Sequence, residues 1–206
     1  MRSAVSQRLR QDIVNGVLRP GSIVTDMELA ARYGASTSPI REALAELTAE
    51  RLIEMPSRAV KRVTQLYRKI SQDLFEIFEL LALRGYEKGA PLVDGEAVGR
   101  MEGALKEHER LAGRDGFAPS LLRDFHDPVF VAAGNRELRR QLGLSYPWLE
   151  RLVTLLRRDR PQRNAGARAR AILTAFKAKE PGQAVQLFGE AVAMLGKQID
   201  SMPDIS

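Results

Sequence analysis

The feature that most constrains the fold of this chain is a pair of helix-start signals placed close together between residues 25 and 39. Thr25 and Glu28 have the spacing of a capping box, in which a hydroxyl and a carboxylate each accept a hydrogen bond from a backbone N–H. Gly34 is a typical helix end, and Ser36–Ser38 with Pro39 favour a new helix start almost at once. The sequence therefore predicts two helices joined by a short turn.

The second helix of this pair has two different faces. Its apolar positions recur at i, i+3, i+4 and i+7, which is the period of one buried helix face. They are Ile40, Ala43, Leu44 and Leu47. The opposite face carries Thr37, Ser38, Arg41 and Ala45. We expect the first face to pack on a core and the second to remain open.

Segments on either side complete a recognisable order of elements. Val5, Leu9 and Ile13 repeat at helical spacing before the stop signal Asn15-Gly16. After the helix pair, residues 52–55 and 59–63 resemble two strands around a turn at residues 56–58. Three helices followed by a basic hairpin is the order of a winged helix-turn-helix.

From Gln65 onward the chain shows helical periods only. Ser71 and Asp94 are expected to cap two of these helices, and further helices are expected over residues 119–133, 136–158, 166–179 and 183–201. Pro128 and Pro147 should kink or split the helices that contain them. The predicted fold is mainly α: a winged helix-turn-helix of three helices and a β-hairpin wing over residues 1–66, then an all-α antiparallel helical bundle of four to seven helices over residues 67–206.

Composition excludes several classes of protein. The 206 residues are 44% hydrophobic and include no cysteine, which excludes disulfide scaffolds, thiol nucleophiles and cysteine-ligated metal sites. No apolar run has membrane-spanning length, and the first residues lack the apolar core of a signal peptide. We therefore expect a cytoplasmic protein without a membrane partner.

The charge of the chain favours a polyanionic partner. The formal net charge is +6 and the pI is about 9.9, so nucleic acid is the first candidate. An arginine-rich composition can also follow from genomic base composition alone. The charge therefore supports the helix-turn-helix interpretation without proving it.

Candidate DNA contacts lie at the start of the third helix and in the wing. Short polar side chains at a recognition-helix N-terminus permit close approach to base edges, and the helix end itself attracts phosphate. The candidates are Ser36, Thr37, Ser38, Arg41, Arg58, Lys61 and Arg62. The alternative is that the Ser-Thr-Ser-Pro segment only caps the helix and that Arg41 is a solvated side chain.

The N-terminal segment resembles the GntR family of bacterial regulators. The matching residues are Leu9–Ile13, Gly16–Gly21, Glu28–Ala30, Gly34–Ser36, Ser38–Leu44, Leu47, Glu50 and Leu52–Ile53. They cover nearly the whole predicted winged domain in the right order. Two residues depart from the pattern, because the family usually has arginine at Thr37 and glycine at Ala59. Arginine at the position of Thr37 typically reads a guanine. The operator of this chain can therefore differ from the one that the family usually reads.

The C-terminal region resembles, more weakly, the FCD effector domain of the FadR-like branch of that family. The resemblance rests on Asp73–Ile77, Phe125–His126, Ala133–Leu138 and Arg170–Leu173. It implies a divalent-metal site of one aspartate and three histidines that helps to hold a carboxylate effector. Here those positions are Leu122, His126, Ala169 and Ala191, and an expected arginine is Phe78. Because His108 and His126 are the only histidines, we predict neither a metal nor another cofactor.

Loss of these ligands predicts an effector pocket that is more apolar than usual, or one that no longer senses an effector. Its candidate residues are Phe78, Leu122, His126 and Phe130. His126 can equally be a hydrogen-bonded core residue, and Phe130 a core aromatic. Residues 136–170 contain ten arginines, which could bind an acidic effector, contact a second subunit or form a solvated helix face.

The predicted function is sequence-specific binding of double-stranded DNA. We expect a homodimeric repressor on a palindromic operator, whose affinity is modulated by a small metabolite, an organic acid or a more apolar molecule. The alternative is a basic protein that binds nucleic acid without sequence preference or effector control. An enzyme is not expected, since no phosphate-binding glycine loop and no Ser/His/Asp order stands out.

Overall fold

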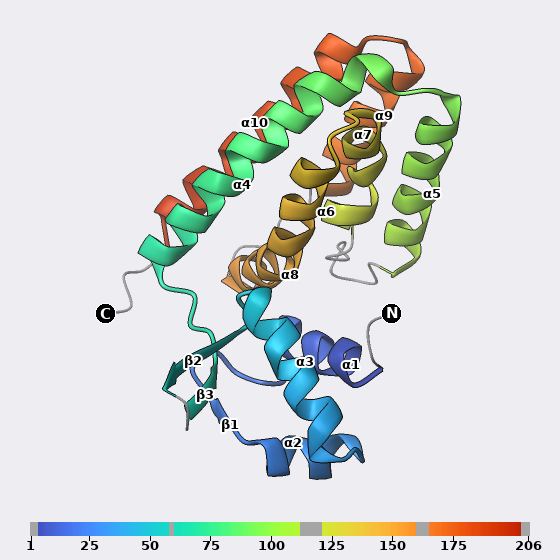
Figure 1. Cartoon of the computed structure of the whole chain (residues 1–206). Coiled ribbons are helices and arrows are strands. Elements are labelled where there is room, and N and C mark those ends of the chain that lie inside the picture. Colours follow the sequence, from blue (N-terminus) through green and yellow to red (C-terminus); the bar gives the residue numbers. More distant parts are fainter. Residues whose placement is uncertain (1–3, 58–59, 112–120, 160–164, 203–206) are drawn as a thin grey trace. The chain divides into compact units, whose positions relative to one another are not determined.

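The computed structural model describes residues 4–57, 60–111, 121–159 and 165–202, and the chain divides into two compact units. The first unit comprises Met1–Leu66 together with Pro147–Leu155, and the second comprises Tyr67–Tyr146 and Leu156–Ser206. Figure 1 traces the elements in chain order. Among the described residues, no helix is both long enough and apolar enough to cross a membrane.

The helices of the first unit begin and end where the sequence signals lie. They are α1 (Ala4–Val14), α2 (Asp26–Tyr33) and α3 (Thr37–Ala49). The predicted capping box of Thr25 and Glu28 is present, and Gly34 ends α2 in the left-handed region at φ 64°. This conformation favours glycine because it lacks a Cβ atom. Three residues separate α2 from α3, as the sequence predicts.

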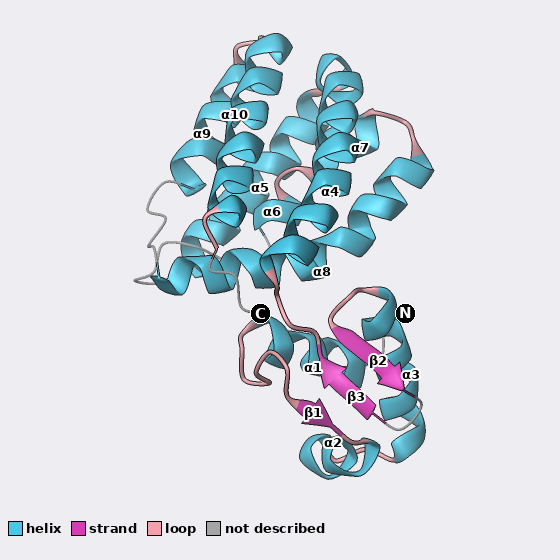
Figure 2. Ribbon diagram, turned by 90° about the vertical axis from the view of Figure 1, so that its left-hand side faces the viewer, coloured by secondary structure: helices cyan, strands magenta, loops and turns pink. Residues whose placement is uncertain are grey.

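The wing is part of a three-stranded sheet rather than a free hairpin. Strands β2 (Ile53–Ser57) and β3 (Val60–Val63) pair antiparallel, and β1 (Ile23–Val24) pairs with the other edge of β3, so the order is β1-β3-β2. Figure 2 shows this small sheet beside the helices of the first unit. The sequence predicts the hairpin but not β1. Pro56 and Ser57, expected in the turn, belong to β2.

The core of this unit forms because α3 buries the apolar face that its spacing predicts. Ile40, Ala43, Leu44 and Leu47 are fully buried and pack with Leu9, Ile13, Leu29, Leu52 and Val63. Each fully buried aliphatic side chain of this size contributes roughly 1.5–3 kcal/mol relative to its exposed state. The packing fixes the rotation of α3 and leaves its polar face exposed.

A buried arginine lies within the same unit. The Arg151 side chain is fully buried, and its Nη2 donates a hydrogen bond to the Thr64 carbonyl oxygen at 2.6 Å. Burial lowers the pKa of Arg151 to about 10, so the guanidinium remains charged at neutral pH. No local sequence pattern indicates a buried cation at this position.

The second unit is entirely helical in its described residues. Its helices are α4 (Arg68–Gly89), the 3-10 helix η1 (Ala90–Leu92), α5 (Gly95–Leu111), α6 (Leu121–Asp124), α7 (Asp127–Ala132), α8 (Arg136–Asp159), α9 (Ala165–Lys177) and α10 (Pro181–Asp200). The middle of α8 is the segment that groups with the first unit. Helices α4 and α10 run antiparallel and side by side (Figures 1 and 2). The mainly α fold that the sequence predicts is confirmed.

Local signals in this unit have mixed outcomes. Asp94 caps α5, since its Oδ1 accepts from the Ala97 N–H at 2.7 Å. Pro128 lies in the first turn of α7, after a break in the helix that the sequence predicts over residues 119–133. Ser71, however, lies inside α4, which begins at Arg68. Pro147 lies inside α8 and does not end it. A proline can be tolerated there when packing holds the rest of the helix.

Candidate DNA interface and effector pocket

The N-terminus of α3 is open to an external ligand. Ser36 is the N-cap residue, with extended backbone at φ −75° and ψ 168°, but its side chain makes no capping hydrogen bond. Thr37 and Ser38 follow in the first turn, and all three residues are exposed. A helix start carries partial positive charge and N–H groups without intrahelical partners. These groups can therefore donate to a phosphate oxygen.

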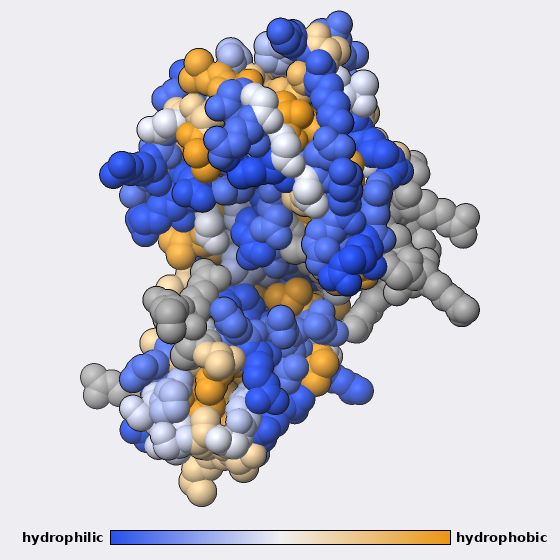
Figure 3. Space-filling model, turned by 90° about the vertical axis from the view of Figure 1, so that its right-hand side faces the viewer, coloured by the Kyte–Doolittle hydropathy of each residue, from blue (hydrophilic) through white to orange (hydrophobic). Residues whose placement is uncertain are grey.

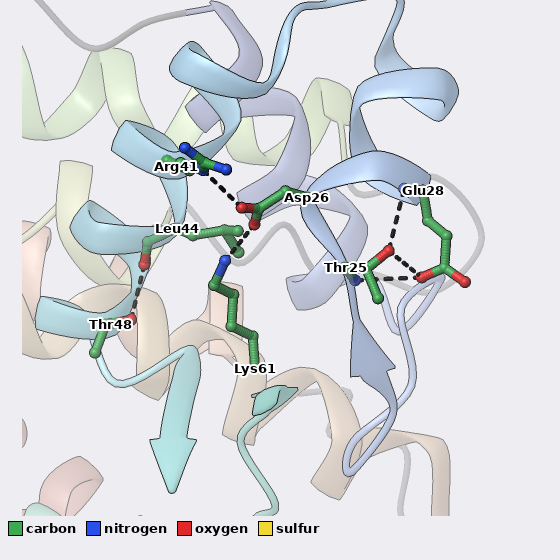
Figure 4. A network of polar contacts seen from close by, with 7 residues as sticks. All are labelled: Thr25, Asp26, Glu28, Arg41, Leu44, Thr48 and Lys61. Carbon is green, nitrogen blue, oxygen red and sulfur yellow. Dashed lines mark hydrogen bonds and ion pairs between the residues drawn. The ribbon is translucent and has the colours of Figure 1, made fainter. Parts of the chain in front are cut away.

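Arg41 and Lys61 meet on one carboxylate, Asp26, the first residue of α2 (Figure 4). The Arg41 Nε lies 2.8 Å from Asp26 Oδ2, and the Lys61 Nζ donates to Asp26 Oδ1. The Asp26 side chain is 15% exposed, whereas that of Arg41 is 68% exposed. The carboxylate thus holds one cation from the third helix and one from strand β3 while leaving Arg41 largely open to solvent.

The two cations also fix the charge of this carboxylate. Hydrogen bonding from Lys61, and then from Arg41, holds the pKa of Asp26 below its usual value. Asp26 is therefore ionised at neutral pH and acts as a fixed anchor. The sequence predicts Arg41 and Lys61 as DNA contacts but misses Asp26, which lies 15 and 35 residues away from them. Its one local signal is an acidic residue in the first turn of a helix, which is common at any helix start.

The other predicted wing residues are placed differently. Arg62 follows Lys61 on β3 and therefore points to the opposite face of the sheet. It lies opposite Glu54 on β2, with 3.9 Å between Arg62 Nη1 and Glu54 Oε1. Arg58 lies outside the described residues. The structure thus brings together Arg41 and Lys61 but not Arg62, and the role of each in DNA binding stays a prediction.

Of the four candidate effector residues, Phe78 and Phe130 are core side chains. Phe78 is 5% exposed and contacts the rings of Phe75 and Tyr146, at centroid distances of 6.0 and 6.2 Å. Phe130 is 2% exposed and meets Tyr86 edge to face at 5.6 Å. Leu122, on α6, is partly exposed. Phe78 and Phe130 therefore contribute to aromatic packing, and an effector role for the four residues stays a prediction.

His126 is at the centre of this aromatic cluster, which we define as Tyr86, Phe125, His126, Phe130 and Phe188. The Tyr86 ring stacks on the Phe188 ring, with 3.7 Å between the ring centroids and 7° between the ring planes. The centroid of the His126 ring lies 5.0 Å from that of Phe188. The Tyr86 hydroxyl is hydrogen-bonded to His126 Nδ1. Three of these residues come from separate parts of the chain, since Tyr86 is on α4, Phe130 on α7 and Phe188 on α10.

Burial determines the protonation of this pair. Desolvation lowers the pKa of His126 to about 3 and raises that of Tyr86 well above 10. The imidazole is therefore neutral and the phenol keeps its proton at neutral pH. Which of the two groups donates, the phenol O–H or an Nδ1–H, is set by the tautomer of the neutral imidazole.

The residues present do not fit the metal site that the family resemblance implies. Leu122 offers no donor atom at the position of the aspartate, and Ala169 and Ala191 offer none at two of the histidine positions. No cluster of three or more histidine or carboxylate side chains suited to a metal ion occurs in the described ranges.

Comparison with known proteins supports the architecture described above. Residues 1–60 match the family described as "Bacterial regulatory proteins, gntR family". The chain is 32% identical over 191 residues to the probable D-xylose utilization operon transcriptional repressor of Paenarthrobacter nicotinovorans, covering 87% of this chain and 82% of that protein.

Two solved structures share the fold along nearly the whole chain. E. coli McbR/YncC superposes with a TM-score of 0.78 at 17% identity, covering 95% of each chain. A putative GntR transcriptional regulator from Rhodococcus sp. RHA1 gives a TM-score of 0.78 at 18% identity, covering 97% of each chain. At these identities the likeness concerns the fold alone.

Proposed function

Since the chain belongs to the GntR family of bacterial regulatory proteins, we propose that it is a homodimeric repressor that reads a palindromic operator with the N-terminus of α3. The family and the named relative are transcription regulators, so the protein is a DNA-binding transcription regulator and not an enzyme. Residues 1–66 would form the DNA-binding domain and residues 67–206 the dimerisation and effector domain. Such a protein would act in the cytoplasm, where its operator is.

The observation that carries this proposal is the arrangement of Arg41 and Lys61 beside the exposed first turn of α3. Asp26 fixes both cations in the free protein, so less side-chain freedom is lost on binding. Thr37 and Ser38 are small enough to allow close approach to base edges, and Arg41 lies one turn further along the helix. We assign base-edge contacts to Thr37, Ser38 and Arg41, and phosphate contacts to Ser36, Lys61, Arg62 and Arg58.

A dimer is supported by an exposed apolar stripe on α4. Ile70, Ile77 and Leu80 recur at helical spacing and are 42, 57 and 62% exposed. A second copy covering this stripe would remove its apolar area from water and would set two recognition helices on successive half-sites. Light scattering should find a dimer for the wild type and a monomer for the Ile77→Glu/Leu80→Glu variant. A wild-type monomer at micromolar concentration would contradict the dimer.

Repression is supported by the Paenarthrobacter relative, which is a probable transcriptional repressor. The dimer could hold its two DNA-binding domains in two different arrangements. A small metabolite bound by the helical domain would adjust operator affinity if it bound one of these arrangements better than the other. We expect this effector to be an organic acid or a more apolar molecule, and to need no metal. Elemental analysis of purified protein tests the last point, since stoichiometric zinc, nickel or manganese would contradict it.

The test of the function as a whole is fluorescence anisotropy with the protein's own upstream intergenic DNA and a scrambled duplex of equal length, at near-physiological salt. A preference of about a hundredfold or more for the upstream duplex is expected of a specific regulator. Equal and strongly salt-dependent affinity for both duplexes is the result expected of the alternative, a non-specific basic nucleic-acid-binding protein.

A further inference from the structure

A cleft on the helical unit gathers arginine side chains from several helices. Its volume is about 770 Å³, within the range of roughly 300–1,000 Å³ that is usual for small-molecule sites. The arginines come from α5, α6 and α8, and they are Arg100, Arg123, Arg136, Arg139 and Arg140. None of the four candidate effector residues predicted from the sequence is among the lining residues of this cleft.

The cleft has a surplus of positive charge. Its lining includes two carboxylates, Asp124 and Asp127, against the five arginines. Arg123 pairs with Asp124 at 2.8 Å, and Arg139 pairs with both carboxylate oxygens of Asp127 at 2.8 Å. Three of the arginines therefore have no carboxylate partner within the cleft lining itself.

These three arginines are free to bind an external anion or can become so at little cost. Arg100 and Arg140 pair along their own helices with Glu96 and Glu137, and the two glutamate side chains are 80 and 64% exposed. Exposed ion pairs of this kind contribute little to stability. Arg136 makes no ion pair with any residue in the described ranges.

The position of these arginines adds a second argument. Arg136, Arg139 and Arg140 all lie near the N-terminal end of α8, whose first residue is Arg136. The partial positive charge of a helix start disfavours cations there and favours anions. An anionic ligand in the cleft would compensate both the arginines and the helix end. Figure 3 shows the hydrophilic character of much of the surface of the helical unit on the side that it displays.

We infer that this arginine cleft binds a small molecule carrying two or more anionic groups, carboxylate or phosphate, and that this molecule is the effector of the repressor. Guanidinium groups suit both anions because they present paired donors to two oxygens at once. Several converging arginines select a ligand with several anionic groups over a single-charged one. The role of this molecule as the effector rests on the proposed function, whereas its binding to the cleft does not.

Isothermal titration calorimetry of the full chain tests the binding, with citrate and fructose 1,6-bisphosphate as polyanionic probes and glucose as the neutral control. At constant ionic strength we expect saturable binding of at least one polyanion, in the millimolar range or tighter, and none of glucose. Which of the two binds distinguishes carboxylate from phosphate recognition. Absence of saturable binding of both polyanions would overturn the site.

Two variants locate the binding. Arg136→Gln/Arg140→Gln should weaken it by about tenfold or more. Arg110→Gln is the matched control, because Arg110 forms the same bidentate pair along its helix, with Glu107, and is not among the lining residues of the cleft. It should bind like the wild type, and both variants should keep the wild-type melting temperature. Unchanged affinity in the double variant would overturn the assignment to this cleft.

A separate measurement of operator binding tests whether the ligand of the cleft is the effector. The bound polyanion should change the wild-type affinity for operator DNA several-fold and should leave that of the double variant unchanged. If the ligand binds but operator affinity does not respond, the cleft is a binding site and its role as the effector site is wrong. If the protein shows no operator preference at all, the proposed function fails, while calorimetry still decides whether the cleft binds anions.

Discussion

The two compact units place their chemically distinctive side chains in opposite ways. In the first unit, Arg41 is held by Asp26 and remains largely exposed. In the second, His126 is neutral and packed among aromatic rings. A polar side chain that is fixed yet exposed can recognise a ligand, whereas one whose ring nitrogen is already hydrogen-bonded inside a cluster contributes to stability. The difference separates the surface that we propose to read DNA from an aromatic cluster that packs the helical unit.

The largest expected effect concerns the close packing of the helical unit. A Cβ atom at Gly89 of α4 would lie 2.0 Å from the backbone oxygen of Val129 on α7. Gly89→Ala must therefore push two helices apart, and we expect it to lower the free energy of unfolding by about 3 kcal/mol. Urea denaturation measures this.

The control for that change is Gly99→Ala on α5, where nothing lies within 4 Å of the added Cβ. Because alanine favours a helix over glycine, this variant should gain about 0.5–1 kcal/mol. If both variants changed stability in the same direction, the tight contact between α4 and α7 would be refuted.

The next effect concerns Asp26, which anchors Arg41 and Lys61 on the surface that we propose to read DNA. Asp26→Asn removes a negative charge beside Arg41 and Lys61 and loosens both cations. We expect tighter binding to a scrambled duplex and less ordered contacts to the operator, so that the preference for operator DNA falls about tenfold. Anisotropy with both duplexes measures the ratio.

Asp12→Asn is the matched control for this charge change. Asp12 also accepts hydrogen bonds from two side chains of the same unit, Arg32 at 3.1 Å and Tyr33 at 2.8 Å, but it holds neither Arg41 nor Lys61. It should keep the wild-type ratio of affinities. An equal loss of preference in both variants would mean that net charge alone, rather than the position of Asp26, sets the selectivity.

A smaller effect than that of Gly89→Ala is expected from pH on the aromatic cluster. The pKa of His126 is about 3 in the folded protein and 6.5 in its ordinary state. Between these values the unfolded chain binds a proton that the folded chain does not, so the free energy of unfolding falls as the pH falls. From about pH 6.5 to 5 the wild type should lose about 1.7 kcal/mol more than the His126→Gln variant.

Urea denaturation of both proteins at the two pH values measures this difference. The chosen range lies above the ordinary pKa values of carboxyl groups, so the comparison isolates the imidazole. A wild type and a variant that lose the same stability over this range would show that His126 is not held in its neutral form by the fold.

Local signals account for what the sequence predicts in the first unit. The capping box at Thr25 and Glu28, the left-handed Gly34 and the apolar spacing of α3 each act within a few residues, and each is present in the structure. Strand β1 has only two residues, Ile23 and Val24. It exists because β3 offers a free edge, and no pattern of two residues can indicate such a partner.

Contacts between distant residues account for what the sequence misses. Asp26 acts through residues 15 and 35 positions away, and the Tyr86–Phe188 stack joins α4 to α10. Ser71 resembles a helix cap, yet it is buried inside α4, since the helix extends three residues further toward its N-terminus. Similarly, Pro147 lies within α8 although the isolated signal favours a break. In each case tertiary packing overrides or supplements the local preference.

The most direct test of the central claim compares Arg41→Ala with Arg32→Ala on operator DNA by fluorescence anisotropy. Both variants remove one exposed, aspartate-paired arginine from the same unit, but only Arg41 lies on the open face of α3. Arg41→Ala should weaken operator binding by about 1–3 kcal/mol, and Arg32→Ala should bind nearly like the wild type. Unchanged affinity of a folded Arg41→Ala protein would contradict the claim that this end of α3 reads DNA.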